Sequence, residues 1–222
     1  MIMDESTLDK IDQAVKSVSH EAHDSIDQRR KYNNRPYKEH PDEVHDIVKE
    51  YGGGIIQRGG ARLHDVFEDV TPNNPKFTTS GVLQLLVERG VPDELAFKMV
   101  FMAWELTDQF FPENHPGMNR VTRKRFEKYR IINLRPPTKT VKLADLKANT
   151  QSIVECDPKF AQTYLKEKHA LLSALADADS RRLWVDVHNL TKDNFAKLKL
   201  GWAPVKRKPM NVDIIEGRAV LL

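Results

Sequence analysis

Hydrophobic residues recur at spacings of three and four along most of the chain, which is typical of amphipathic helices. The first such run predicts a helix that begins near Ser6 and buries Leu8, Ile11, Val15, Val18, Ala22 and Ile26. A short second helix is expected at 41–51, with Pro41 in its first turn and the glycines 52–54 at its end. No strand pattern and no internal repeat accompanies these runs, so the sequence predicts a mainly α fold.

The middle of the chain continues this pattern. A helix is expected near 81–89, where Gly90 stops it, and a basic helix near 122–130. Between them, "PDELAFKMVFMAWELTDQFF" is apolar on most faces, which predicts the central buried helix. The segment "INLRPPTKT" is expected to be extended, because Pro136 and Pro137 disfavour a helix.

Two further helices are expected at 141–154 and 157–178. From Trp202, with Pro204 and Pro209, the chain is expected to be an extended tail. The sequence therefore predicts one helical domain over residues 1–200 and a tail over 201–222.

Composition limits the class of protein. The 222 residues are 40% hydrophobic, which is enough for one substantial core or two small ones. No apolar run approaches the ~20 residues that span a membrane, and the first residues lack a signal-peptide pattern. The only cysteine, Cys156, lies between two acids that disfavour a thiolate. We expect a soluble cytoplasmic protein without an internal disulfide, in which Cys156 is a bystander.

The formal net charge is only +3, but the charge is uneven. Residues 1–28 contain seven acids and two lysines, whereas residues 28–38 contain five basic residues and no acid. Residues 120–142 contain nine basic residues and a single acid, Glu127. Such basic clusters attract phosphate, so the sequence predicts an anionic nucleotide or nucleic acid as the partner.

The stretch "GGARLHDVFEDV" combines His64 and Asp65 with Glu68 and Asp69. On one continuous helix, side chains four residues apart share a face, so these four groups would converge. Hydrophobic residues between them require part of the helix to be buried, and a buried carboxylate cluster needs a cation, a proton or water. These four residues are interpreted either as part of a metal site or as a solvated helix end.

Further ligands are needed, because two donors hold a divalent ion poorly. His40 lies where a loop is expected to lead into a helix, and Asp145 lies on a predicted helix with Asn149 one turn later. Two imidazoles and two carboxylates suit Mn²⁺ or a similar first-row ion.

Three segments, "RRKYNNRPYKEHPDEV", "ARLHDVFEDV" and "TKTVKLADLKAN", resemble in order and spacing the motifs of HD-domain hydrolases of the RelA/SpoT type. The likeness is greatest to small stand-alone alarmone hydrolases and extends from about His23 to about Ala176. Val70 departs from the usual threonine of that family, and the segment before Asp145 is expanded. The resemblance implies an all-α HD-domain helical bundle that removes the 3′-pyrophosphate from (p)ppGpp or (p)ppApp.

The resemblance also implies a role for each matching residue. His40, His64, Asp65 and Asp145 would bind the metal, and Glu68 and Asp69 would orient and deprotonate the attacking water. Substrate would be bound by Arg30, Lys31 and Asn149, with a lesser contribution from Arg29. A bound divalent ion would bring the pKa of its water to about 7 and polarise a phosphoryl oxygen.

Other interpretations remain open from the sequence. In one alternative, the domain hydrolyses another nucleotide, such as a deoxynucleoside triphosphate. In the other, it is a degenerate HD fold that binds nucleic acid or protein. Residues 120–142 fit a rim that gathers anionic substrate better than a nucleic-acid surface. The pairs His23-Asp24 and His45-Asp46 are expected on solvated faces, and the first helix is a possible homo-oligomer contact.

Overall fold

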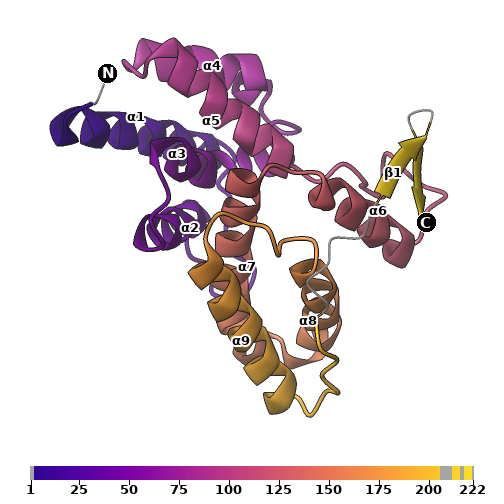
Figure 1. Ribbon diagram of the computed structural model, residues 1–222. Helices are drawn as coiled ribbons and strands as arrows, with labels where there is room; N and C mark the ends of the chain where they lie inside the picture. Colours follow the sequence, from indigo (N-terminus) through magenta and orange to yellow (C-terminus); the bar gives the residue numbers. More distant parts are fainter. Residues whose placement is uncertain (1–2, 206–211, 216–217, 222) are drawn as a thin grey trace.

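The computed structural model describes residues 3–205, 212–215 and 218–221 (Figure 1). Over residues 3–205 the secondary structure is helical, which confirms the predicted all-α class. The α-helices of the described residues are α1 (Glu5–Asp24), α2 (Glu39–Glu50), α3 (Ile55–Leu63), α4 (Thr79–Glu88), α5 (Asp93–Leu106), α6 (Arg120–Ile132), α7 (Pro136–Cys156), α8 (Pro158–Leu172) and α9 (Arg181–Lys197). A π-helix, η1 (Val66–Val70), and a 3₁₀-helix, η2 (Pro75–Phe77), lie between α3 and α4.

The central buried helix is α7, which contacts α2, α3, α5, α8 and α9 (Figure 1). Its buried residues lie on all of its faces. The expectation of an extended segment at Pro136 and Pro137 was wrong, because both prolines occupy the first turn of α7. There a proline lacks only an N–H that has no partner within a helix, and its fixed φ suits the helix.

The expectation that α5 is the central buried helix was also wrong. Its inner face is buried, but Phe97 is 58% exposed and Trp104 is 49% exposed on the outer face, with Phe101 between them. The three rings stack on one another, with centroids 6.1 and 5.8 Å apart. This segment therefore contains more apolar side chains than its buried face needs, and the extra ones lie at the surface.

Two hydrophobic clusters meet at α3. One is built around α2, α7 and α9 and includes Ala61, and the other, around α1, α4 and α5, includes Leu63 and Val66. Within α3, Gly59 and Gly60 lie against Met99 and Met102 of α5, and a Cβ at either glycine would overlap those side chains. This close approach fixes the end of α3, where the histidine-aspartate pair begins.

No helix was predicted over the residues of α9, which packs on α7 and α8. Its Leu183, Trp184 and Val187 are buried, and the indole N–H of Trp184 donates a hydrogen bond of 2.9 Å to the carbonyl of Leu172. In the segment expected to be an extended tail, β1 (Val212–Ile215) pairs antiparallel with β2 (Arg218–Leu221), with Val212 opposite Leu221. No helix within the described residues has both the length and the apolar character that crossing a bilayer requires.

Candidate metal centre

The stretch that contains the histidine-aspartate pair is not one continuous helix. The α3 helix ends at Leu63, and His64 and Asp65 form a junction before the π-helix η1. The N–H of Thr71 bonds to the carbonyl of Val66, five residues back, at 3.1 Å. The wider turn changes which residues share a face, so the argument from a spacing of four was wrong in its geometry. Such π-turns are frequent at functional sites.

Four side chains from three segments converge at this junction. His64 Nε2 lies 3.0 Å from Asp65 Oδ2 and 3.8 Å from Asp145 Oδ1. His40, near the start of α2, places its Nε2 3.6 Å from Asp65 Oδ2 and 3.4 Å from Asp145 Oδ1. One ligand atom each from His40, His64 and Asp65 lies within 4.8 Å of the others. The predicted ligand set is therefore together in space.

The tautomer of His64 suits a metal ligand. Its Nδ1 lies 2.7 Å from the carbonyl oxygen of Ala61. A carbonyl only accepts, so Nδ1 carries the hydrogen and the Nε2 of the neutral ring carries the lone pair. That Nε2 is buried and has no hydrogen-bond partner, although it faces two carboxylates. A buried lone pair beside two carboxylates fits a cation, and the nitrogen and oxygen donors suit a divalent first-row metal.

The electrostatics of the cluster also favour a cation. Burial alone would lower the pKa of His64, but the charges of Asp65 and Asp145 outweigh it and raise that pKa well above its usual value. Without a metal these carboxylates therefore favour a proton on Nε2, and a bound cation would take the place of that proton. Burial would raise the pKa of Asp145, but Lys142 and the histidines hold it well below its ordinary value. Both carboxylates therefore stay ionised in a buried place, where positive charge stabilises them.

Glu68 and Asp69 of η1 behave differently from the ligand carboxylates. Burial, with the negative charges of Asp108 and Asp65, raises the pKa of Glu68 to about 7. Burial and the charge of Asp65 raise the pKa of Asp69 to about 6. Two carboxyl groups that exchange protons near neutral pH thus lie beside two that remain ionised, which is the separation of roles that acid–base chemistry requires.

Residues to which the sequence assigned no role hold these carboxylates in place. The hydroxyl of Tyr37 donates to Asp65 Oδ2 at 2.8 Å, and the amide of Gln28 donates to Asp69 Oδ2 at 2.8 Å. Gln28 Oε1 lies 2.6 Å from Nδ1 of His23. Tyr37 precedes His40 by three residues within the motif that carries the resemblance, so its contact with the metal site could have been predicted. The contact between Gln28 and Asp69 joins distant segments and has no signature in the sequence.

A cavity of about 440 Å³ adjoins the cluster, and the predicted substrate residues Arg30, Lys31 and Asn149 line it together with His40. Arg30 pairs with Glu43 at 3.2 Å, and the amide of Asn149 donates to Asp145 Oδ1 at 2.6 Å. The Lys31 side chain is 72% exposed and lies 3.9 Å from Asp157. Cys156, expected to be a bystander, also lines this cavity and is exposed.

Arg29 lies apart from these residues. Its guanidinium bonds to Asp27 at 2.6 and 2.9 Å on the surface, and Arg29 does not line the cavity. The adjacent loop positions Arg30 instead: the N–H of Arg30 donates to the carbonyl of Arg35 at 2.9 Å, and the N–H of Tyr37 donates to that of Gln28 at 2.9 Å. This short antiparallel arrangement brings Arg30 and Tyr37 to the same side.

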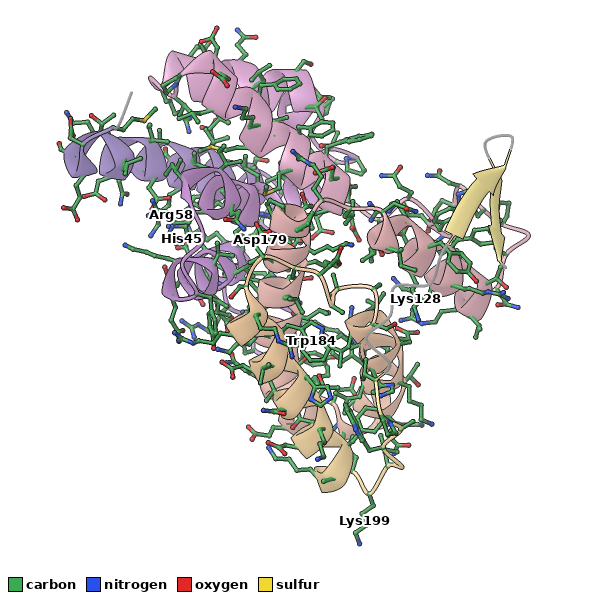
Figure 2. All side chains as sticks on the ribbon, viewed as in Figure 1. His45, Arg58, Lys128, Asp179, Trp184 and Lys199 are labelled. Atoms are coloured by element: carbon green, nitrogen blue, oxygen red, sulfur yellow. The ribbon has the colours of Figure 1, made fainter. Side chains whose placement is uncertain are left out.

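The expectation that His23 and His45 lie on solvated faces was wrong, because they are 1% and 3% exposed. His23 packs at an angle against Tyr37, with ring centroids 5.1 Å apart, and so supports the candidate metal centre. His45 bonds through Nε2 to Asp12 at 2.8 Å, where α1, α2 and α3 meet (Figure 2). Histidines on inward helix faces find acidic or amide partners here, and the dipeptide pattern does not reveal them.

No protein-family model and no curated protein matches the sequence. Among solved structures, the chain is similar to a metazoan orthologue of SpoT that hydrolyses ppGpp and plays a role in starvation responses. The TM-score is 0.62 at 17% sequence identity, and the match covers 89% of this chain and 97% of that chain. The expected resemblance to HD-domain hydrolases of the RelA/SpoT type is confirmed at the level of the fold, which is an all-α HD-type bundle.

Proposed function

We propose that this protein is a metal-dependent phosphohydrolase that removes the 3′-pyrophosphate from alarmone nucleotides such as (p)ppGpp or (p)ppApp. The observation that carries the proposal is the convergence of His40, His64, Asp65 and Asp145, from three segments, beside two carboxyl groups of raised pKa. A fold shared with a protein that hydrolyses ppGpp supports the same conclusion.

In this proposal, His40, His64, Asp65 and Asp145 hold a divalent cation, for which Mn²⁺ is our choice. When bound, the ion would supply a water molecule of lowered pKa and a positive charge that would polarise a phosphoryl oxygen. Tyr37 fixes the orientation of Asp65 through its hydrogen bond, and Asn149 does the same for Asp145.

The residues of the chain supply the proton transfer and the substrate contacts. Glu68 takes a proton from the attacking water, a role worth roughly 10²–10⁴-fold in rate. Asp69, held by Gln28, orients that water. Arg30 and Lys31 neutralise phosphate or stack on the base, and Asn149, which lines the same cavity, contacts the nucleoside.

The test is incubation of the purified protein with Mn²⁺ and a panel of nucleotides, with products identified by chromatography. Release of pyrophosphate from a 3′-position supports the proposal. Cleavage only of the 5′-chain, as for a deoxynucleoside triphosphate, would instead indicate an HD hydrolase of another nucleotide. Absence of both turnover and metal binding would indicate a degenerate fold that acts as a binding module.

The matched variants are His64→Ala, which removes a proposed ligand, and His20→Ala, which removes a histidine that pairs with Asp42 outside the cluster. We expect His64→Ala to abolish metal-dependent hydrolysis while circular dichroism remains that of the wild type. Undiminished turnover in His64→Ala would refute the assignment of the metal site.

A further inference from the structure

A second cavity, of about 370 Å³, lies between α6, α7 and α8. It shares no lining residue with the cavity that contains Arg30 and Asn149. Lys128 lies on the side of α6 that faces α8 (Figure 2), and Lys142 of α7 and Lys168 of α8 complete the basic lining with Lys124, Arg125 and Lys166. Part of the basic run of 120–142 therefore lines this cavity, together with residues of α8.

The acids of this cavity are already engaged. Asp108 pairs with Lys124 at 2.9 Å, and Glu167 pairs with Arg120 at 2.7 Å. Glu127 accepts the N–H groups of Gln109 and Phe110 and bonds to Arg130.

Three lysines of the same lining have no such counter-charge. Within the part of the chain that the structure describes, Lys128, Lys166 and Lys168 form no ion pair. The ammonium of Lys168 lies 4.9 Å from the centroid of the Tyr164 ring. An anion that entered the cavity would therefore meet three unneutralised lysines.

A bound anion would stabilise the charged form of two of these lysines, Lys128 and Lys168. Burial lowers the pKa of Lys128, and burial with the charge of Lys142 lowers the pKa of Lys168 to about 8. A partly buried ammonium without a counter-charge is costly, and a phosphate oxygen would replace its lost hydration with charge-assisted hydrogen bonds.

This cavity adjoins the proposed reaction centre from the Glu68 side. Lys142 lies 3.1 Å from Asp145 Oδ2, and the N–H of Asp108 donates to Glu68 Oε2 at 3.2 Å. Lys142 and Asp108 both line the cavity. His40 and Asn149, in contrast, line the cavity assigned to the nucleoside. A phosphorus atom held at the metal centre would therefore have one cavity on each side.

We propose that the cavity between α6, α7 and α8 binds the pyrophosphate group that leaves the substrate, so that the nucleoside and the leaving group occupy separate cavities. This inference rests on the proposed function. The water oxygen forms a bond to the 3′-phosphorus as the bond from that phosphorus to the ribose 3′-oxygen breaks. Glu68 takes one water proton, and the 3′-oxygen takes a proton from solvent. The pyrophosphate leaves with the water oxygen, and its several negative charges match the three unpaired lysines.

The test uses inorganic pyrophosphate as the probe, with the full chain kept free of metal by a chelator. Isothermal titration calorimetry is expected to detect binding by the wild-type protein. Lys168→Gln and Lys128→Gln are each expected to weaken it roughly tenfold, because each removes one charge-assisted contact. Lys192→Gln, on the exposed face of α9, is the matched control and is expected to bind as the wild type does. Equal binding by Lys168→Gln and the wild type would overturn the proposal.

A second measurement separates a substrate subsite from an effector site. Nucleotides that carry a 3′-diphosphate are compared with those that carry a 3′-monophosphate, and Lys168→Gln is expected to reduce the preference for the diphosphate. An unchanged preference would mean that the cavity does not bind the leaving group. Pyrophosphate binding is measured without metal and does not depend on hydrolysis. Weaker binding by Lys168→Gln therefore supports pyrophosphate binding in this cavity even if no nucleotide is hydrolysed, so the two proposals can fail separately.

Discussion

The hydroxyl of Tyr37 donates a hydrogen bond of 2.8 Å to Oδ2 of Asp65, the same oxygen that lies 3.0 Å from Nε2 of His64. One tyrosine therefore determines the direction in which a candidate ligand presents its charge. Partners of this kind commonly matter nearly as much as the ligands that they orient.

We predict that Tyr37→Phe preserves the fold but weakens divalent-metal affinity by roughly 10–100-fold, the usual cost of losing a partner that orients a metal ligand. Calorimetric titration with Mn²⁺ measures this change. The control is Tyr32→Phe, since Tyr32 is 41% exposed and bonds to Asp157, outside the cluster. Wild-type affinity in Tyr37→Phe would show that Asp65 is oriented by other contacts.

Glu68→Gln is predicted to reduce the rate of hydrolysis by roughly 10²–10⁴-fold, because glutamine cannot accept the proton of the attacking water. Metal affinity should change little, since Glu68 is not among the proposed ligands. Steady-state kinetics together with a metal titration separate the two effects. A variant that loses metal and activity in parallel would identify Glu68 as a ligand.

The same substitution is predicted to stabilise the metal-free protein at high pH. Burial raises the pKa of Glu68 from 4.5 to about 7, so the carboxyl favours the folded state only while it is protonated. That stability is present below pH 4.5 and is lost as the pH rises to about 7. At pH 8, Glu68→Gln should raise the free energy of unfolding by on the order of 2 kcal/mol, with a smaller gain at pH 5. Urea unfolding at the two pH values measures it, and an equal gain at both would contradict this account.

Asp12→Asn is predicted to destabilise the fold by roughly 3–5 kcal/mol, because it removes the counter-charge of Arg58 and one of the two carboxylates that pair with Arg62. Asp12 bonds to His45 at 2.8 Å and lies 3.7 and 3.8 Å from Arg58 and Arg62. Asp46→Asn is the matched control: Asp46 bonds to the other nitrogen of His45, but its side chain is 76% exposed. Urea denaturation compares the two variants, and equal losses would assign the effect to His45 alone.

Cys156 is predicted to report on occupancy of the nucleoside cavity. It is exposed and lines the same cavity as Arg30 and Asn149. We expect a nucleotide substrate to slow the labelling of this single thiol by a maleimide in the metal-free protein, which mass spectrometry follows over time. Inorganic pyrophosphate, assigned to the other cavity, should leave the labelling rate unchanged.

Periodicity and motif spacing were enough to predict much of this architecture. The run from Leu8 to Ile26 predicted α1, since each of its turns places an apolar residue on one face. The grouping of His40, the His64-Asp65 pair and Asp145 was predicted from a resemblance of separated motifs, and these side chains do lie together. Their roles stay predictions.

Other features depend on the tertiary structure and were missed. Pro136 and Pro137 are compatible with either a loop or a first helical turn, and packing around α7 decides between them. The π-turn at Val66 gives no pattern that differs from an ordinary helix. His45 is buried because Asp12, 33 residues earlier, supplies a partner, and such a pairing has no local signature.

Asp145, Lys142 and Asn149 all lie on one rigid helix, α7. This helix therefore connects metal binding, product binding and recognition of the base. Asn149 faces one cavity, Lys142 faces the other, and Asp145 lies at the reaction centre between them. A tilt or sliding of α7 would thus shift all three in concert and could not adjust one alone. Recognition of the base, affinity for the ion and retention of the product are therefore expected to vary together among variants that repack this helix, even where the altered residue touches none of the three.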